Sequence, residues 1–465
     1  MFSVSSRARW AAALAVSLAA LGQAVPDAVA APAAAGVRAD ARDDFNGDGY
    51  ADLAVAAPGA TVAGASRAGY VAVMYGGPHG LSTTRRTVIS RATTGIPGSP
   101  VAGQTFGAQL SRGDLDGDGY ADLVVASGGN GAPVVVWGGP NGLSGGTSVP
   151  GRNTQTGDFD GDGRMDLALF TPRGTGGDDP GGTTATVWSG PVDRTGTPAA
   201  AAPLTAERLA YLDVYDGAAG DVNGDGYADL VVTGYGGDGN YGSQLYLGSA
   251  QGLAPAGTPV PGGGLAVALG DVNGDGCDDV VAGVDIDERV DVAYGSPSGV
   301  TPRTAWTTLT QDTPGVPGAT ESNDRFGAAV AVGDITGDGI DDIAVGVPGE
   351  WLGDNPKDAG MVEVLRGGRS GVTGAGAQGF TQNTAGVPGT AEAGDVFGAE
   401  VRLADVNGNG YADLAAAAPG EDDRNGALWS LRGRPAGIVT DAALVLGPRG
   451  IGAPYAKAGF GTVLK

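Results

Sequence analysis

A nine-residue phrase that occurs seven times constrains this chain more than any other feature. Each copy begins and ends with Asp, places oxygen-bearing side chains at alternate positions, and has glycine at its fourth and sixth positions. The copies begin 44 to 71 residues apart, which indicates repeated structural units. They span residues 44–52, 114–122, 158–166, 221–229, 271–279, 334–342 and 405–413.

The phrase has the chemistry of a calcium-binding loop. Ca²⁺ takes about six to eight oxygen ligands in flexible geometry, which short carboxylates on a curled backbone can supply. Positions 1, 3, 5 and 9 would offer side-chain oxygens and position 7 its backbone carbonyl, while glycine permits left-handed backbone angles. We therefore expect up to seven structural Ca²⁺ ions. The candidate metal ligands are Asp44, Asn46, Asp48, Tyr50, Asp52, Asp114, Asp116, Asp118, Tyr120, Asp122, Asp158, Asp160, Asp162, Arg164, Asp166, Asp221, Asn223, Asp225, Tyr227, Asp229, Asp271, Asn273, Asp275, Cys277, Asp279, Asp334, Thr336, Asp338, Ile340, Asp342, Asp405, Asn407, Asn409, Tyr411 and Asp413.

Two other structures share parts of this pattern. A single Asp-Gly phrase is typical of a β-turn, but seven copies in register argue against turns alone. The EF-hand needs a Glu at position 12, where these copies have apolar residues such as Val55 and Val125. We expect the copies that begin at Asp114 and Asp158, with four Asp each, to bind metal most tightly. The copy that contains Asn409 should bind most weakly.

Composition limits the partners and the location. The formal net charge is −25, and the basic patches that bind phosphate are lacking, which argues against nucleic acid and anionic membranes. Residues 1–30 combine two arginines, an apolar run and a small-residue cleavage site, which is typical of a secretory signal peptide. We assign residues 31–43 to a linker. No later segment reaches the ~18 apolar residues of a membrane-spanning helix, so we expect a secreted, extracellular protein without membrane insertion.

A short apolar run after each phrase predicts a buried β-strand. Examples are residues 53–57, 123–126, 230–233 and 343–347. A second strand and a glycine-rich turn follow, which indicates four-stranded antiparallel units. Several phrases are also preceded by a strand that we expect to start at a Phe-Gly pair. These pairs are Phe106-Gly107, Phe326-Gly327 and Phe397-Gly398.

The first repeat lacks that preceding strand, and the missing copy, Phe460-Gly461, lies at the other end of the chain. A displaced first strand is what a closed ring of blades requires, because one blade is then assembled from both ends of the chain. The expected fold class is therefore all-β. We predict a seven-bladed β-propeller of four-stranded antiparallel blades over residues 44–465, closed by pairing of the N- and C-terminal strands.

The chain resembles the FG-GAP repeats of the N-terminal β-propeller of integrin α-subunits and similar repeats of secreted bacterial proteins. The resemblance rests on the Phe-Gly pairs, the acidic phrases and small-small-Pro endings such as Ala56-Ala57-Pro58. It runs from about Asp44 to Leu464. The third to fifth repeats depart from it because they lack the Phe-Gly pair. The resemblance implies the propeller fold and a binding or cell-adhesion role, rather than integrin signalling.

We expect a monomeric binding module, not an enzyme, whose partner is an extracellular protein or a glycan. Loops opposite the acidic phrases would carry the binding, with Tyr235, Tyr241 and Trp351 as candidate contacts or as blade packing. The single His79 and single Cys277 supply no evident catalytic triad. The alternative is an extracellular polysaccharide hydrolase or lyase on a calcium-stabilised propeller. Such an enzyme would need carboxylates that converge at the central channel.

Overall fold

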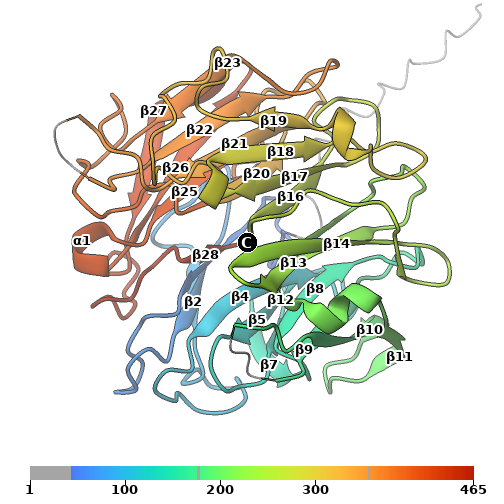
Figure 1. Ribbon diagram of the computed structural model, residues 1–465. Helices are drawn as coiled ribbons and strands as arrows, with labels where there is room; N and C mark the ends of the chain where they lie inside the picture. Colours follow the sequence, from blue (N-terminus) through green and yellow to red (C-terminus); the bar gives the residue numbers. More distant parts are fainter. Residues whose placement is uncertain (1–42, 175–177, 354–356) are drawn as a thin grey trace, which may run out of the picture. The chain divides into compact units, whose positions relative to one another are not determined.

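Seven antiparallel sheets of four strands each make up the part of the chain that the computed structural model describes, residues 43–174, 178–353 and 357–465. The sheets are the blades of a seven-bladed β-propeller, arranged around a centre where the C-terminus lies (Figure 1). The predicted fold class is confirmed. The helical segments described are short: η1 (Glu207–Tyr211), η2 (Asp285–Asp287), η3 (Arg303–Ala305) and α1 (Glu421–Arg424).

Blades 1 to 7 follow the chain order of the seven acidic phrases, and the strands of each blade are counted from the centre outward. The first strands, from blade 1 to blade 7, are β28 (Val463–Leu464), β4 (Phe106–Gly113), β8 (Asn153–Gly157), β12 (Asp213–Gly220), β16 (Val267–Gly270), β20 (Ala329–Gly333) and β24 (Glu400–Ala404). The second strands are β1 (Leu53–Ala57), β5 (Asp122–Ser127), β9 (Asp166–Pro172), β13 (Asp229–Gly237), β17 (Asp279–Val284), β21 (Asp342–Val347) and β25 (Asp413–Ala418).

The third and fourth strands form the outer half of each blade. The third strands are β2 (Tyr70–Met74), β6 (Val134–Trp137), β10 (Thr183–Val192), β14 (Asn240–Leu247), β18 (Arg289–Ala293), β22 (Met361–Arg366) and β26 (Ala427–Arg434). The fourth strands are β3 (Arg86–Ile89), β7 (Ser144–Ser148), β11 (Pro198–Leu204), β15 (Ala254–Pro255), β19 (Thr307–Leu309), β23 (Thr373–Phe380) and β27 (Gly437–Leu446).

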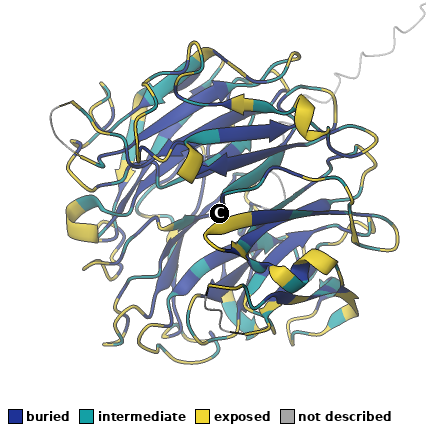
Figure 2. Cartoon of the chain, viewed as in Figure 1, coloured by how far each residue is buried: buried dark blue, intermediate teal, exposed yellow. Residues whose placement is uncertain are grey.

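The second strands are the apolar runs that the sequence predicts. Residues 53–57 are β1, and the other three predicted runs lie within β5, β13 and β21. Every residue of β1, β5, β17 and β21 is buried. Neighbouring blades cover both faces of these strands, so they read as continuous apolar runs without polar alternation. At the periphery β11 is mostly exposed, and Figure 2 shows the burial concentrated in the strands.

The predicted ring closure is confirmed. Val463 and Leu464 of β28 pair with Ala56 and Val55 of β1. The Lys465 N–H donates to the Ala54 carbonyl at 3.0 Å, and the Ala54 N–H donates to the Lys465 carbonyl at 2.7 Å. The first strand of each blade contacts that of the next blade, and β24 of blade 7 contacts β28 of blade 1. The chain therefore forms a closed ring.

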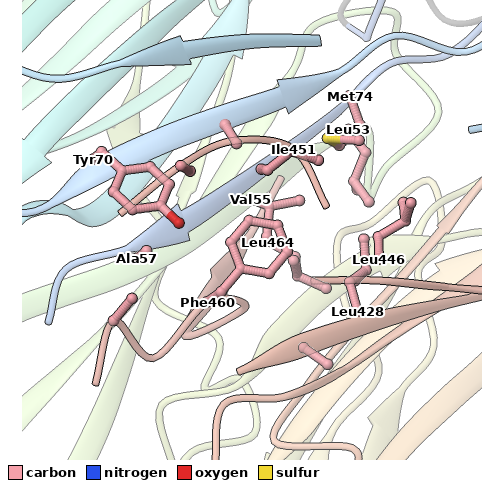
Figure 3. Close-up of a cluster of buried hydrophobic side chains, with 14 of the residues drawn as sticks. Leu53, Val55, Ala57, Tyr70, Met74, Leu428, Leu446, Ile451, Phe460 and Leu464 are labelled. Atoms are coloured by element: carbon pink, nitrogen blue, oxygen red, sulfur yellow. The ribbon is translucent and has the colours of Figure 1, made fainter. Parts of the chain in front are cut away.

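Apolar side chains from both ends of the chain reinforce this closure. Phe460 is fully buried and Leu464 is 4% exposed. They pack with Leu53 and Val55 of blade 1, and with side chains of blade 7 such as Leu428 (Figure 3). The C-terminal segment thus belongs to the core between blades 1 and 7.

The Phe-Gly pairs differ in part from the prediction. We expected them to start strands, and Phe106 does lie at the start of β4. Phe326 and Phe397, however, precede β20 and β24 by three residues. The glycine has a left-handed φ in all three pairs, +96° at Gly107, +90° at Gly327 and +85° at Gly398, so it interrupts the extended backbone. Only Phe106 still pairs with the second strand, at Ser127, and β4 is irregular between Phe106 and Gln109. The Phe326 and Phe397 side chains are fully buried and pack between their own blade and the preceding one.

The predicted signal peptide and residues 31–42 of the predicted linker lie outside the described residues. Asp43, which we assigned to the linker, is buried and belongs to the closed ring. Its carboxylate pairs with Arg112 of blade 2 and, at 2.9 Å, with Arg402 of blade 7. Asp43 therefore links the two blades that flank blade 1. Within the described residues, no helix is long and apolar enough to cross a membrane.

Removal of residues 460–465 should open the ring. The deletion takes away β28 and the buried Phe460 and Leu464, each of which contributes about 3 kcal/mol, and leaves β1 as an unpaired sheet edge. We predict a Tm lower by about 5 °C or more, with aggregation visible by light scattering. Lys457→Gln, which changes an exposed residue just before the deleted segment and keeps β28, is the control and should leave Tm within about 1 °C. A truncated protein that stays monomeric at the full Tm would contradict the closure.

Candidate metal centres in the acidic loops

The seven acidic phrases, now called acidic loops 1 to 7 in chain order, connect the first and second strands of their blades. In blade 1 the first strand comes from the C-terminal end, so loop 1 simply precedes β1. Because the connection is the same in every blade, all seven loops lie on one face of the propeller. The connections between strands two and three, and from strand four to the next blade, lie on the opposite face.

The first Asp of each loop organises the loop backbone. In loop 1, Asp44 Oδ1 accepts hydrogen bonds from the N–H groups of Gly47 (2.6 Å) and Asp48 (3.2 Å). Its Oδ2 accepts one from Gly49 at 2.8 Å, and the corresponding bond recurs in all seven loops at 2.7–2.9 Å. Gly47 and Gly49 have φ of +72° and +85°, which other residues rarely adopt. The loops are thus curled around one carboxylate.

The closing Asp of each loop ties the loop to the rest of its blade. Asp52 is 1% exposed; its Oδ2 accepts the Phe45 N–H and its Oδ1 the Gly76 N–H, both at 2.9 Å. The glycine at the end of the third strand donates in the same way in every blade. These donors are Gly76, Gly138, Gly190, Gly248, Gly295, Gly367 and Gly433, at 2.7–3.0 Å.

Burial sets the electrostatics of these closing carboxylates. It raises the pKa of Asp52 and of Asp122 to about 8, although the two backbone N–H donors lower it and the other loop carboxylates raise it further. The same causes raise the pKa of Asp229 and Asp279 to about 7. A buried carboxylate that already accepts two N–H groups still lacks a positive charge. A bound cation beside it would supply that charge.

The structure brings three acidic ligand positions together in two loops. One carboxylate oxygen from each of Asp114, Asp116 and Asp122 lies within 4.8 Å of the others in loop 2. In loop 3 the corresponding residues, Asp158, Asp160 and Asp166, are arranged alike. These are the loops that we expected to bind most tightly. The other five have Asn or Thr at position 3, so their ligand there would be neutral.

Arginine side chains reach two of the loops, which the sequence did not indicate. Arg194, from the turn between β10 and β11 of blade 3, pairs with Asp116 at 2.5 Å and with Asp118 at 2.7 Å. Arg85 pairs with Asp48 of loop 1. Loop 2 therefore has a counter-ion of its own, and the fifth-position Asp118 is directed toward Arg194. Loop 3 has the same four carboxylates, and none of the described ion pairs involves them.

Neighbouring loops also contact one another through position 7, which we expected to offer only a backbone carbonyl. A Cβ on Gly47 would lie 2.5 Å from the Tyr120 ring, so only glycine lets this side chain pack on the preceding loop. The same contact closes the ring, where Tyr50 of loop 1 packs on Gly408 of loop 7. The signal was present in the sequence, since position 7 is Tyr in four copies.

The backbone repeats this link. The Ala121 N–H of loop 2 donates to the Asp44 carbonyl of loop 1 at 2.9 Å. Equivalent bonds join loops 3 to 4, 4 to 5, 5 to 6, 6 to 7 and 7 to 1 at 2.8–3.3 Å. Six of the seven pairs of neighbouring loops are therefore linked on one face of the propeller, and the pair of loops 2 and 3 is the exception.

The donor set fits a hard divalent cation. Each loop offers several oxygens on a backbone that its first Asp already curls, and carboxylates with carbonyls are the ligands that Ca²⁺ and similar ions prefer. The first, third, fifth and closing side chains, with the carbonyl of position 7, would hold the ion. Its charge would offset the repulsion between carboxylates that lie within 4.8 Å in loops 2 and 3.

The fold and the loops together define a repeat β-propeller with metal-type loops on one face. Models of the FG-GAP repeat match residues 35–74, 326–365 and 397–431. Models of the FG-GAP-like repeat match residues 114–169, 158–232 and 221–282. The repeats of this chain are therefore FG-GAP repeats, assembled into a seven-bladed β-propeller.

Integrin α-subunits are among the curated relatives. Integrin alpha-8 of Gallus gallus is 32% identical over 194 residues, which are 39% of this chain and 16% of that protein. Integrin alpha-4 of Xenopus laevis is 34% identical over 115 residues, 24% of this chain and 10% of that protein. The matched part thus spans about a sixth of these relatives or less.

Two solved structures are similar at low identity. A candidate 6-phosphogluconolactonase from Bacteroides uniformis has a TM-score of 0.47 at 12% identity and covers 89% of this chain and 99% of that one. The Aleuria aurantia lectin, in complex with alpha-methyl-L-fucoside, has a TM-score of 0.38 at 11% identity, with 73% and 94% covered.

A comparison of Asp122→Ala with Asp118→Ala separates the two roles of loop 2. Asp122→Ala leaves two buried N–H groups without acceptors and should destabilise by about 2–5 kcal/mol both in calcium and in EDTA. Asp118 accepts no buried N–H, so its removal should matter mainly in calcium. Differential scanning calorimetry of both variants and the wild type in each buffer measures this, and EDTA should lower the wild-type Tm. Equal effects of Asp118→Ala in both buffers would contradict a metal role.

Arg194 should weaken cation binding at loop 2, because a guanidinium already neutralises Asp116 and Asp118. We predict that Arg194→Gln raises the affinity of this loop for Ca²⁺ by about threefold to tenfold, the effect of about one unit charge near the site. Isothermal titration of the EDTA-stripped protein measures it. Arg173→Gln, an exposed residue on the opposite face, is the control. Weaker binding in Arg194→Gln would show that Arg194 supports the loop instead.

Proposed function

We propose that this protein is a secreted, calcium-stabilised β-propeller that binds an extracellular protein or glycan through the face opposite its acidic loops. The acidic loops act as structural sites for Ca²⁺, because their oxygens suit a hard cation and each loop gathers several of them around a buried closing carboxylate. An extracellular location agrees with this chemistry, since millimolar calcium outside cells fills sites of moderate affinity. Binding rather than catalysis is the role proposed.

The proposal rests on one observation: most of the exposed large apolar side chains lie on the face opposite the acidic loops. Nine large apolar residues are exposed in the described part of the chain, and eight lie on or beside the connections opposite the acidic loops. Exposed apolar groups on one face mark interaction surfaces. The eight are Val101, Tyr211, Tyr215, Tyr241, Leu265, Ile286, Trp351 and Tyr455, whereas the ninth, Val445, lies on the outer strand β27.

Five of these residues gather over blades 4 and 5. Tyr241, Leu265 and Ile286 line one cavity of about 660 Å³, together with Asp285, Glu288 and Arg325. The Tyr241 and Tyr235 rings pack edge to face with centroids 5.8 Å apart, so the aromatic group is rigid. Rigid aromatic side chains beside charged hydrogen-bonding groups suit the hydrophobic face of a sugar or an anchor residue of a protein.

A polysaccharide hydrolase or lyase is the second candidate, and one observation favours it. The inner strands enclose a channel cavity of about 490 Å³ lined by Asp216, Glu400 and Lys465. Burial raises the pKa of Glu400 to about 8, while Lys465 lowers it and Asp216 raises it. Burial therefore favours the protonated form of Glu400, and a protonated carboxyl is the general acid that glycosidic cleavage needs. Asp216, however, already accepts Gln155 Nε2 at 2.9 Å.

Screening the calcium-loaded protein against glycan and extracellular-protein arrays tests the binding function. The double variant Tyr241→Ala/Ile286→Ser should weaken the affinity for a ligand found in this way by tenfold or more, because anchor residues contribute about 2 kcal/mol each. Val445→Ser, which removes an exposed apolar residue elsewhere, is the control and should bind normally. Binding that survives the double variant would place the ligand site elsewhere.

The same preparation tests the second candidate. Release of reducing ends or unsaturated products from a polysaccharide panel, abolished by Glu400→Gln, would favour the enzyme. An inactive wild type with saturable binding would favour the binding module.

A further inference from the structure

Two clusters of largely buried polar side chains, here called the blade 6 and blade 7 pockets, have the same plan and lie on the face opposite the acidic loops. Each is made where the connection that enters a blade meets the connection between that blade's second and third strands. Each combines a Gln just after a fourth strand, an Asp two residues before the Phe of a Phe-Gly pair, and a Glu in a Pro-Gly-Glu segment. The blade 6 pocket contains Gln311, Asp324, Glu350 and also Glu363, and the blade 7 pocket contains Gln382, Asp395 and Glu421.

In the blade 7 pocket two carboxyl groups touch. Gln382 Nε2 donates to Glu421 Oε2 at 2.6 Å, and the Glu421 side chain is in hydrogen-bonding contact with Asp395. Asp395 is 2% exposed, and its Oδ2 also accepts the Glu392 N–H at 2.7 Å. Two carboxyls can touch only if a proton or a cation lies between them.

The blade 6 pocket has the same parts and one carboxylate more. Gln311 Nε2 donates both to Glu350 Oε2 at 3.0 Å and to Glu363 Oε1 at 3.1 Å. Asp324 is 2% exposed and accepts the Glu321 N–H at 2.8 Å. The charges that act on Glu350 are those of Asp324 and Glu321, and both raise its pKa in addition to burial.

Three buried oxygens in these pockets have no hydrogen-bond partner among the described residues. They are Oε1 of Gln382, Oε1 of Gln311 and Oε2 of Glu363, on side chains that are 1%, 2% and 0% exposed. Buried polar atoms are almost always satisfied, so each of these oxygens indicates a missing partner. The other polar atom of each side chain is already hydrogen-bonded within its pocket: the Nε2 groups of Gln311 and Gln382 donate to pocket carboxylates, and Glu363 Oε1 accepts from Gln311 Nε2.

A neutral partner such as water would satisfy a lone pair of these oxygens but would leave carboxylates that lie side by side repelling one another. A cation would satisfy the oxygens and remove the repulsion as well.

Blade 2 shows the same position with a built-in cation. Arg91 occupies the place of Gln311 and Gln382. In all three blades the backbone N–H of the residue just before this position donates to the hydroxyl of a Thr three residues further along the chain, at 2.9–3.0 Å. Arg91 is 7% exposed and donates to the Pro97 carbonyl at 2.8 Å and the Ala132 carbonyl at 2.6 Å. Blade 2 has Gln104 and Gly129 where blades 6 and 7 have Asp and the Gly before Glu. Blade 2 therefore has a fixed positive charge at this position, and the carboxylates of the blade 6 and blade 7 pockets are absent from the compared positions.

We propose that the blade 6 and blade 7 pockets are two further sites for a hard divalent cation, of which Ca²⁺ is the probe of choice. Glu421 and Asp395 would bind the ion in blade 7, and Glu350 and Glu363 in blade 6. The unpartnered oxygens are further donors, and carboxylates with an amide oxygen match the preference of Ca²⁺. Each ion would join two connections of the face opposite the acidic loops. This inference does not depend on the proposed function.

The double variant Asp395→Asn/Glu421→Gln tests the blade 7 pocket with little change of shape. Equilibrium dialysis with ⁴⁵Ca²⁺ should give one bound ion per chain fewer than the wild type. The sign of the stability change should also depend on metal: Tm higher than the wild type in EDTA, because the repulsion is gone, and lower in calcium. Asp422→Asn/Asp423→Asn, which neutralises two exposed neighbours, is the matched control and should keep the wild-type stoichiometry.

Glu350→Gln/Glu363→Gln repeats the measurement in blade 6, so the result does not depend on one variant that folds poorly. Crystals soaked in Tb³⁺ locate the ions through anomalous scattering, with peaks expected in both pockets. Unchanged stoichiometry in both double variants, or Tb³⁺ peaks in the acidic loops but none in the pockets, would overturn the proposal. Either result would instead assign a shared proton to each carboxyl pair.

Discussion

Each blade depends on the hydrogen bonds that the closing Asp of its acidic loop accepts. Its two oxygens accept one N–H from the loop and one from the end of the third strand, as Asp52 does with Phe45 and Gly76. One buried carboxylate thereby fixes the loop to a strand that lies two positions outward in the blade. Hydrogen bonds from N–H groups to a buried charge are strong, and loss of their acceptor leaves both donors unsatisfied.

The ring follows from links between such units. Tyr120 on Gly47 and the Ala121 N–H on the Asp44 carbonyl join loop 2 to loop 1, and similar links run around most of the circle. Loops 2 and 3 are the exception: no bond of this kind joins them in the described chain, and nothing lies within 4 Å of a Cβ built on Gly117. There the Val192 N–H donates to the Leu115 carbonyl at 2.7 Å. With β28 and Asp43 closing blade 1, every blade is held from both sides.

Patterns in the sequence were sufficient to predict the fold. Side-chain contacts between residues far apart in the sequence could not be predicted. The acidic phrases and the apolar runs after them are contiguous, so blade number and second strands could be inferred, and the displaced Phe460 segment revealed the closure. The donor Gly76 is 24 residues from Asp52, and Arg194 is 78 residues from Asp116. No local pattern links such pairs. The Phe-Gly pairs misled because a left-handed glycine next to a strand looks like part of it.

The loops on one face of the propeller are similar to one another, whereas the connections on the other face differ. On the acidic face the same nine positions recur, because each loop must bind its own blade and its neighbours. On the opposite face the connections differ in length and in residues, so the same backbone position holds Arg91 in blade 2 but Gln311 and Gln382 in blades 6 and 7. On this face one blade can present exposed Tyr and Ile side chains while another has paired carboxyl groups. Specific recognition needs such differences, which a ring of identical loops cannot provide.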